Sequence, residues 1–266
     1  SFIGTGVGAL GALVSSRLLA YYDFPWNFFL VFLTAAIAIN VSWIFIALIR
    51  EPEQRSVDHE DSQSGSWARM GRVVKRDSIF RSFLAYRVVM VSGAMGTGFL
   101  TVTAIQRWAV EDSIVGYFTA VLLLGQTVGS LLAGMLADRY GHKAPLVLGG
   151  MAQVSGFVLA LTSPAPEGFF VVFALVGFAM GVHMVSGTLV ALEFSEPSRR
   201  PTYVGIANTT AGVAGSIAPL IGGWLASVGY QTLFSICIVL GAMALVWLLV
   251  GVRDPRSRKP PVPAMT

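Results

Sequence analysis

The sequence predicts an all-α integral membrane protein with eight transmembrane helices. Apolar residues make up 55% of the 266 residues and charged residues only 12%, whereas soluble domains hold roughly 45–50% and 25%. The mean hydropathy is +0.70. The apolar residues gather in runs of about twenty, the length that a helix needs to cross roughly 30 Å of hydrocarbon. So few charges could not cover a soluble protein of this length, which excludes a soluble enzyme or binding module.

The eight runs are expected to be helices rather than strands. Strands of a membrane barrel show segments of about ten residues with alternating polarity, and the runs here are continuously apolar. A helix also satisfies its backbone hydrogen bonds internally, as the bilayer requires. In chain order, the expected helices cover residues 2–20, 24–49, 83–105, 114–137, 144–161, 169–192, 203–228 and 232–252.

The cations mark alternate loops. They lie between the second and third expected helices, the fourth and fifth, the sixth and seventh, and after the eighth, whereas the other loops hold one cation, Arg107. By the positive-inside rule the basic loops are cytoplasmic. We therefore expect a bacterial inner-membrane protein with a cytoplasmic C-terminus. The pI near 9.5 then reports topology rather than nucleic-acid binding, and Arg87 belongs to the cytoplasmic end of the third helix.

One long polar stretch, residues 50–82, separates the second and third expected helices. Its first part has the composition of a linker. In its second part, Trp67, Met70 and Val74 fall on one face of a helix and the arginines fall elsewhere. This pattern predicts a helix on the anionic inner leaflet, and a solvated connector with a chance apolar stripe is the alternative.

Two segments of the chain resemble each other. GTGVGALGALVSSRLLA at residues 4–20 and AGVAGSIAPLIGGWLAS at residues 211–227 carry small residues at matching positions, and each precedes a short loop and another apolar run. Since the second copy opens the last helix pair of a six-helix block, the first is expected to open the last pair of a block whose first four helices precede residue 1. The predicted domains are residues 1–49, the last two helices of an N-terminal bundle; 50–82, a cytoplasmic linker; 83–252, a C-terminal six-helix bundle; and 253–266, a cytoplasmic tail.

The loop between the fourth and fifth expected helices carries the most specific motif of the chain. It reads Gly134-x-x-x-Asp138-Arg139-x-Gly141-His142-Lys143. This motif resembles the signature loop of the major facilitator superfamily, which joins the second and third helices of each half of that fold. The resemblance covers the whole chain and implies a truncated fold, helices five to twelve of twelve. It also implies alternating access, with the loop latching the two halves on the cytoplasmic side. His142 stands where the family usually has Arg or Lys.

Individual residues of this loop and of the neighbouring helices have predicted structural roles. Gly141 permits the left-handed turn that ends a helix, and Gly134 is expected to let a neighbouring backbone approach closely. Asp138, the only acid of the loop, can face the positive N-terminal end of another helix. Further small residues at four-residue spacing predict tight helix packing: Gly125, Gly129, Ala133 and Ala137, followed by Gly177 and Gly181.

The expected helices are nearly free of charge. No Asp or Glu lies deep in any of them, and His183 is the one ionisable residue that we place at mid-depth. Because such a residue indicates function, His183 is a candidate to contact substrate or to carry a proton. A neutral histidine bonded to a helix neighbour is the alternative. The family resemblance places its helix beside the central cavity. The other candidates for the substrate site are Gln126, Asn208, Thr97 and Thr101.

The predicted function is secondary active transport of a small molecule across the lipid bilayer, with protons as the candidate coupling ion. A cavity without Arg or Lys favours a neutral or amphipathic compound, and efflux is the first choice. Uptake of a sugar or metabolite stays open, as does a non-transporting receptor or assembly protein on the same fold. The sequence holds no nucleotide-binding loop, metal-ligand cluster or nucleophile with a nearby base. We therefore predict no enzyme, no catalytic residue, no metal, no cofactor and no nucleic-acid partner.

Overall fold

The structure is a computed structural model, and the residues that it describes are helical, with no strand among them. It describes residues 11, 14, 15, 17, 18, 21–48, 66–110, 112–195 and 199–252. The chain divides into two compact units, Ser1–Val57 and Asp58–Thr266. The first contains α2 (Trp26–Ala47), none of whose residues is buried. The first expected helix, residues 2–20, falls almost entirely outside the described residues.

Seven helical segments of the described chain are long and apolar enough to cross a membrane. They correspond to the second to eighth expected helices. The helices of the second unit are α3 (Ser66–Arg76), α4 (Ser78–Gly93), the short 3-10 helix η1 (Thr97–Phe99), α5 (Leu100–Trp108), α6 (Asp112–Tyr140), α7 (Lys143–Thr162), α8 (Gly168–Glu193), α9 (Arg200–Val228) and α10 (Tyr230–Gly251). The sequence therefore predicted this all-α membrane architecture correctly.

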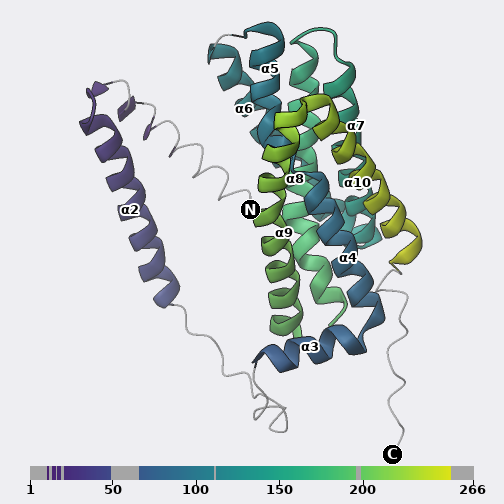
Figure 1. Cartoon of the computed structure of the whole chain (residues 1–266). Coiled ribbons are helices and arrows are strands. Elements are labelled where there is room, and N and C mark those ends of the chain that lie inside the picture. The colour runs from purple at the N-terminus through teal and green to yellow at the C-terminus, as the bar shows by residue number, and fades with distance from the viewer. Residues whose placement is uncertain are drawn as a thin grey trace, which may run out of the picture. The chain divides into compact units, whose positions relative to one another are not determined.

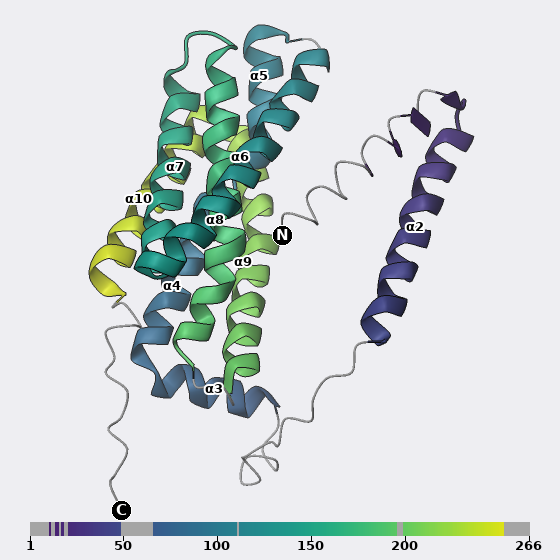
Figure 2. The same cartoon turned by 180° about the vertical axis from the view of Figure 1, so that it is seen from behind.

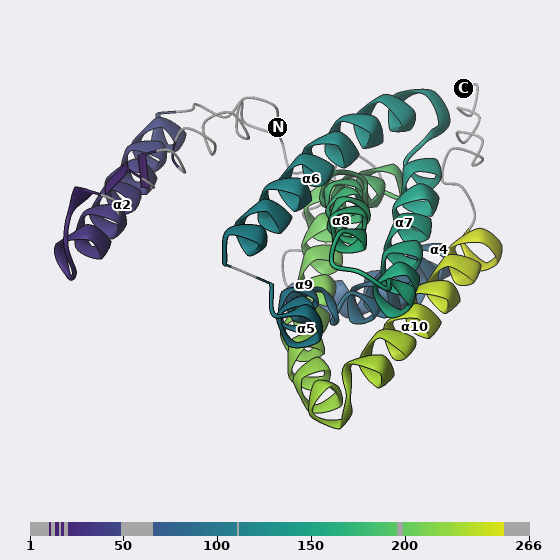
Figure 3. The same ribbon diagram turned by 90° about the horizontal axis from the view of Figure 1, so that it is seen from above.

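Within the second unit, α8 lies in the middle of the bundle, with α6, α7 and α9 around it (Figure 3). The helix α4 packs against α9 and α10. The pairing of α6 with α8 is the most extensive and depends on glycine. A methyl group at Gly125 would overlap the carbonyl oxygen of Ala174, and one at Gly181 would overlap that of Gln126. Gly129 and Gly177 make equally close contacts, which confirms the predicted packing role of these small residues.

The third expected helix differs from its prediction, because it begins earlier and is broken. It begins at Ser78, where the Asp77 carboxylate accepts hydrogen bonds from the backbone N–H groups of Ile79 and Phe80. It breaks after Gly93, where Ala94 N–H donates to the carbonyl of Val91, and η1 and α5 continue the span. Hydropathy reveals neither feature, since it does not register a helix cap and since apolar residues continue on both sides of the break.

The linker ends in the predicted helix, α3, which crosses the end of the bundle below α4 and α9 (Figure 1, Figure 2). Met70, Val73 and Val74 pack against the buried core at this end, which includes Phe80 and Tyr203. The apolar face of α3 is thus covered by the bundle itself, an arrangement that neither alternative from the sequence described. The side chain of Trp67 lies outside the described part of the structure.

Candidate functional site

The signature loop makes the turn that its sequence predicts. The helix α6 ends at Tyr140, and Gly141 follows with φ 81°, the left-handed conformation that only glycine adopts without strain. The Gly141 N–H donates to the carbonyl of Ala137 at 2.9 Å. The next helix begins two residues later, and Pro145 occupies its first turn.

Lys143 and His142 of the loop are bound to other helices of the bundle, whereas Arg139 is exposed. The Lys143 ammonium donates to the carbonyl oxygens of Leu249 and Val252 at 3.2 and 2.7 Å, so it caps the C-terminal end of α10. His142 Nδ1 and the buried Ser186 Oγ share a hydrogen bond of 3.2 Å. The Arg139 guanidinium lies 5.3 Å from the ring centre of Tyr140. The loop therefore ties α6, α7, α8 and α10 together.

Two other residues of the motif face away from this bundle. Asp138 is exposed on the last turn of α6. A methyl group placed at Gly134 would meet no atom within 4 Å in the described part of the chain. The prediction that Gly134 lets a neighbouring backbone approach is therefore wrong within this unit.

A cavity of about 320 Å³ lies where α4, η1, α6, α7 and α8 converge. It lies beside the break between α4 and η1, where the Gln153 amide donates to the Met90 carbonyl at 3.3 Å. Apolar side chains and methionines form most of its wall. Its polar or ionisable lining residues are Tyr86, Arg87, Thr97, Gln126, Gln153 and His183. Discontinuous helices lining a cavity at membrane depth are a typical setting for a binding site.

Arg87 corrects two predictions. It lies nine residues into the span from Ser78, about 13 Å along the helix axis, and it lines the cavity. Its guanidinium donates to the Gly187 carbonyl of α8 at 2.5 Å and to Asn208 Oδ1 of α9 at 3.5 Å. His183 is therefore not the only ionisable residue inside the spans, and the cavity is not neutral. Asp77, an N-cap residue six positions before the predicted start at residue 83, was the signal in the sequence that the helix begins earlier and that Arg87 lies further inside it.

His183 lines the cavity from α8, one helical turn from Gly187. Its Nε2 atom is buried and has no hydrogen-bond partner among the described residues. The same holds for the hydroxyl of Tyr86, whose ring packs against Phe83. The alternative of a neutral histidine bonded to a helix neighbour therefore requires the other ring nitrogen, Nδ1.

The other predicted site residues divide into two groups. Gln126 and Thr97 line the cavity, and the Gln126 amide lies 3.7 Å from the sulfur of Met184. Thr101 and Asn208 do not line it, although Asn208 holds Arg87. Sequence reasoning assigned no site role to Arg87, which was taken as part of a cytoplasmic helix end, and it did not single out Tyr86.

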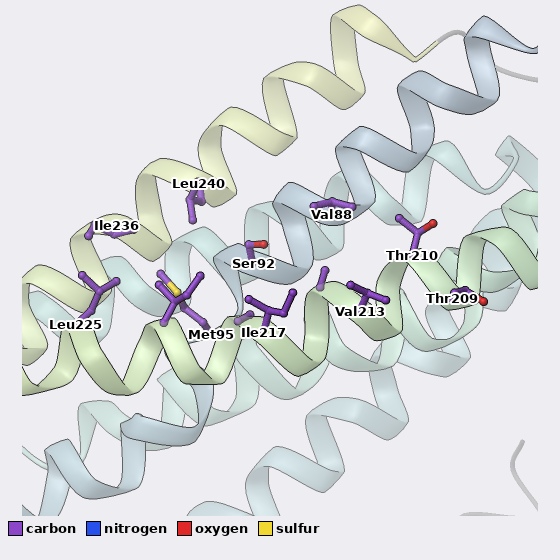
Figure 4. Close-up of a pocket in the computed structure, with 13 residues that line it drawn as sticks. Val88, Ser92, Met95, Thr209, Thr210, Val213, Ile217, Leu225, Ile236 and Leu240 are labelled. Atoms are coloured by element: carbon purple, nitrogen blue, oxygen red, sulfur yellow. The ribbon is translucent and has the colours of Figure 1, made fainter. Parts of the chain in front are cut away.

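A second, larger cavity of about 720 Å³ lies between α4, α9 and α10 (Figure 4). Its walls are apolar apart from the hydroxyls of Ser92, Thr209 and Thr210, and Thr210 donates its hydroxyl to Ile206 of its own helix. Specific ligand sites need a few well-placed polar groups on an apolar wall. The smaller cavity meets this requirement better, so we take it as the candidate site.

Comparison with known proteins agrees with the loop and the helical bundle. The family model described as Major Facilitator Superfamily matches residues 94–265. The chain belongs to this superfamily. The match covers the second part of the broken span, the signature loop and the helices α6 to α10, and it begins after α4.

The relatives of the chain in this superfamily are transporters with varied substrates. It is 29% identical over 172 residues to the tetracenomycin C resistance and export protein of Streptomyces glaucescens, covering 60% of this chain and 31% of that protein. It is 27% identical over 173 residues to the 4-hydroxybenzoate transporter PcaK of Acinetobacter baylyi, covering 64% and 37%. It is 30% identical over 149 residues to the 3-(3-hydroxy-phenyl)propionate transporter of Escherichia coli, covering 54% and 36%. The chain spans about a third of the length of these relatives.

Proposed function

We propose that this chain forms part of a secondary active transporter that moves an amphipathic small molecule by alternating access. The observation that carries the proposal is the cavity of about 320 Å³ beside the broken helix, with polar groups set in an apolar wall. Transporters of this general architecture bind substrate near the bilayer midplane and rock two helix bundles around it. Residues 83–252 would supply one bundle, and the other would close the cavity from the opposite side.

The relatives support the class of substrate. Their names include an exporter of tetracenomycin C and transporters of 4-hydroxybenzoate and of 3-(3-hydroxy-phenyl)propionate. These compounds combine a ring with polar groups, and the cavity combines aromatic, methionine and polar side chains in the same way. Efflux of an amphipathic compound is our first choice of direction, with protons as the coupling ion.

The signature loop is proposed to latch the two bundles. Lys143 is bound within this unit, whereas the Asp138 carboxylate is exposed and so remains available to a helix end of the other bundle. Such a contact would stabilise one orientation of the bundles without touching the substrate.

Counterflow in proteoliposomes tests the proposal on the full-length protein. Vesicles loaded with an unlabelled compound, such as 4-hydroxybenzoate or a polycyclic aromatic drug, should accumulate the labelled compound transiently and saturably. Asp138→Asn keeps the shape of the side chain and removes its charge, so it should lower the rate several-fold with little change in half-saturating concentration. If no compound of either kind exchanges, a non-transporting membrane protein on the same fold is the better description.

A further inference from the structure

Arg87 is a cation inside a transmembrane bundle, and the described chain offers it only neutral partners. Its guanidinium carries five N–H donors, and two of its nitrogens donate to the Gly187 carbonyl and to Asn208 Oδ1. No carboxylate forms an ion pair with it among the residues that the structure describes. A charge inside a membrane protein is costly unless it is paired. The two hydrogen bonds therefore hold the guanidinium in place, but its positive charge needs an anion from outside the described residues.

Two other residues that line the cavity each have a polar atom without a partner among the described residues. The hydroxyl of Tyr86, on the same helix as Arg87, is buried without a hydrogen bond in the described part of the chain, and so is Nε2 of His183. Buried polar groups are nearly always satisfied, so each orphan calls for an explanation such as an absent ligand. A phenol can donate, and an imidazole nitrogen can donate or accept according to its tautomer. Both residues line the same cavity as Arg87, so an anion bound beside the guanidinium would lie near them.

The rest of the cavity wall suits an apolar body. Phe83, Met90, Val176, Met180 and Met184 come from α4 and α8 and contribute rings, branched chains and thioethers. Methionine adapts its shape to ligands and makes favourable contacts with aromatic rings. The cavity thus places one cation and two orphan polar groups against an apolar surface.

We propose that this cavity binds the carboxylate of an aromatic monocarboxylic acid, with Arg87 as its ionic anchor and with Tyr86 and His183 as hydrogen-bonding partners. The inference rests on the proposed transport function and specifies the substrate class of the same site. The planar guanidinium matches the two oxygens of a carboxylate. A single cation balances one negative charge, which favours a monocarboxylate over a phosphate dianion. The ring of the acid lies against the methionines and Phe83.

Matched acids and amides test the proposal on the purified full-length protein in lipid nanodiscs. The probes are benzoate with benzamide and 3-phenylpropionate with 3-phenylpropionamide, and binding is measured as ligand-dependent thermal stabilisation. Each amide keeps the shape of its acid without the charge. The acids should bind the wild-type protein roughly 10- to 100-fold more tightly than the amides, the range expected for hydrogen bonds to a charged group. Arg87→Gln should abolish this preference, and Arg87→Lys should keep part of it, because lysine retains the charge but not the planar fork.

Arg107→Gln is the matched control, since it removes an arginine of the same span that lies outside the cavity. Arg107 donates to the Ala160 carbonyl at 3.1 Å and lies over the ring of Trp108. This variant should retain the full preference for acids. Equal binding of acid and amide by the wild type, or an intact preference in Arg87→Gln, overturns the carboxylate assignment. A protein that exchanges neutral drugs in counterflow but binds no acid also overturns it, and in that case the transport function stands.

Discussion

Arg87 and His183 line one cavity but are held differently. Arg87 is fixed through hydrogen bonds to α8 and α9, whereas Nε2 of His183 is buried without a partner in the described chain. A methyl group placed on Gly149 of α7 would lie 3.5 Å from this nitrogen, so Nε2 is close to α7. An imidazole in this position is suited to bind substrate or to carry a proton through the transport cycle.

His183→Gln separates these roles by keeping a polar side chain that cannot titrate. If His183 carries the coupling proton, wild-type transport should depend on pH between about 5 and 8, the range in which histidine commonly titrates. The variant should lose that dependence and uphill accumulation while retaining downhill exchange. The measurement is uptake into proteoliposomes with and without a proton gradient. Among the described residues, Arg87 and Tyr86 are the other ionisable groups of the cavity.

His59→Gln is the control for this experiment, because it removes a histidine from the polar stretch at residues 50–82. It should keep the wild-type pH profile. Uphill transport by His183→Gln with an unchanged pH profile would mean that His183 has only a packing role.

At the scale of elements, the contact between α6 and α8 holds the bundle together through glycine. Gly125 and Gly129 of α6, and Gly177 and Gly181 of α8, each leave no room for a side chain. Membrane helices gain little from the hydrophobic effect against one another, so close backbone contact supplies much of their association energy. The same contact places Gln126 and His183 on facing helices of the cavity.

Gly181→Ala should therefore destabilise the protein. The added methyl group would overlap the Gln126 carbonyl and force the helices apart, at a cost of about 1–3 kcal/mol for overpacking. The measurement is the unfolding midpoint in a titration of mixed micelles with a denaturing detergent.

Gly134→Ala is the matched control on α6, because its methyl group would meet nothing within 4 Å in the described chain. It should be neutral, or stabilising by up to about 1 kcal/mol through helix propensity. A midpoint for Gly181→Ala at or above that of Gly134→Ala would show that the two helices can separate without cost.

At the scale of the whole molecule, charge and geometry suggest one orientation. The linker helix α3, the signature loop and the end of α10 lie at the same end of the bundle (Figure 1). The loops at this end carry most of the cations. The positive-inside rule then assigns this end to the cytoplasm, and we propose that both the linker and the C-terminal tail lie there.

Cysteine labelling tests this orientation in intact cells that make the full-length protein. A cysteine at Ser227, near the end of α9, should react with an impermeant reagent added outside. A cysteine at Ser62 should react only after the membrane is opened. Cys237 is fully buried and should not react in either case. Labelling at Ser62 but not at Ser227 would reverse the topology.

The sequence alone determined the spans, the turn of the signature loop and the glycine packing, because each depends mainly on residues that are close together in the chain. Whether twenty residues can cross a bilayer depends on their own hydropathy, so the spans from residue 24 onward were predicted with small errors at their ends. The turn at Gly141 depends on the conformation of one residue, and the signature motif is a contiguous string. The spacing of Gly125, Gly129, Gly177 and Gly181 follows from the helical repeat, which also makes their packing role predictable.

The tertiary structure decided what depends on how helices rotate and where they break. Gly134 was also expected to approach another backbone, and only the structure shows that it meets none among the described residues. Arg87 was assigned to the cytoplasmic end of its helix because hydropathy locates a helix start only to within several residues. The helix begins five residues earlier than predicted, and this difference places Arg87 in the wall of the cavity. Thr97 and Thr101 stand on either side of a helix start, and only Thr97 lines the site. A binding site is a convergence of side chains from several helices, and no single segment contains the angles between them.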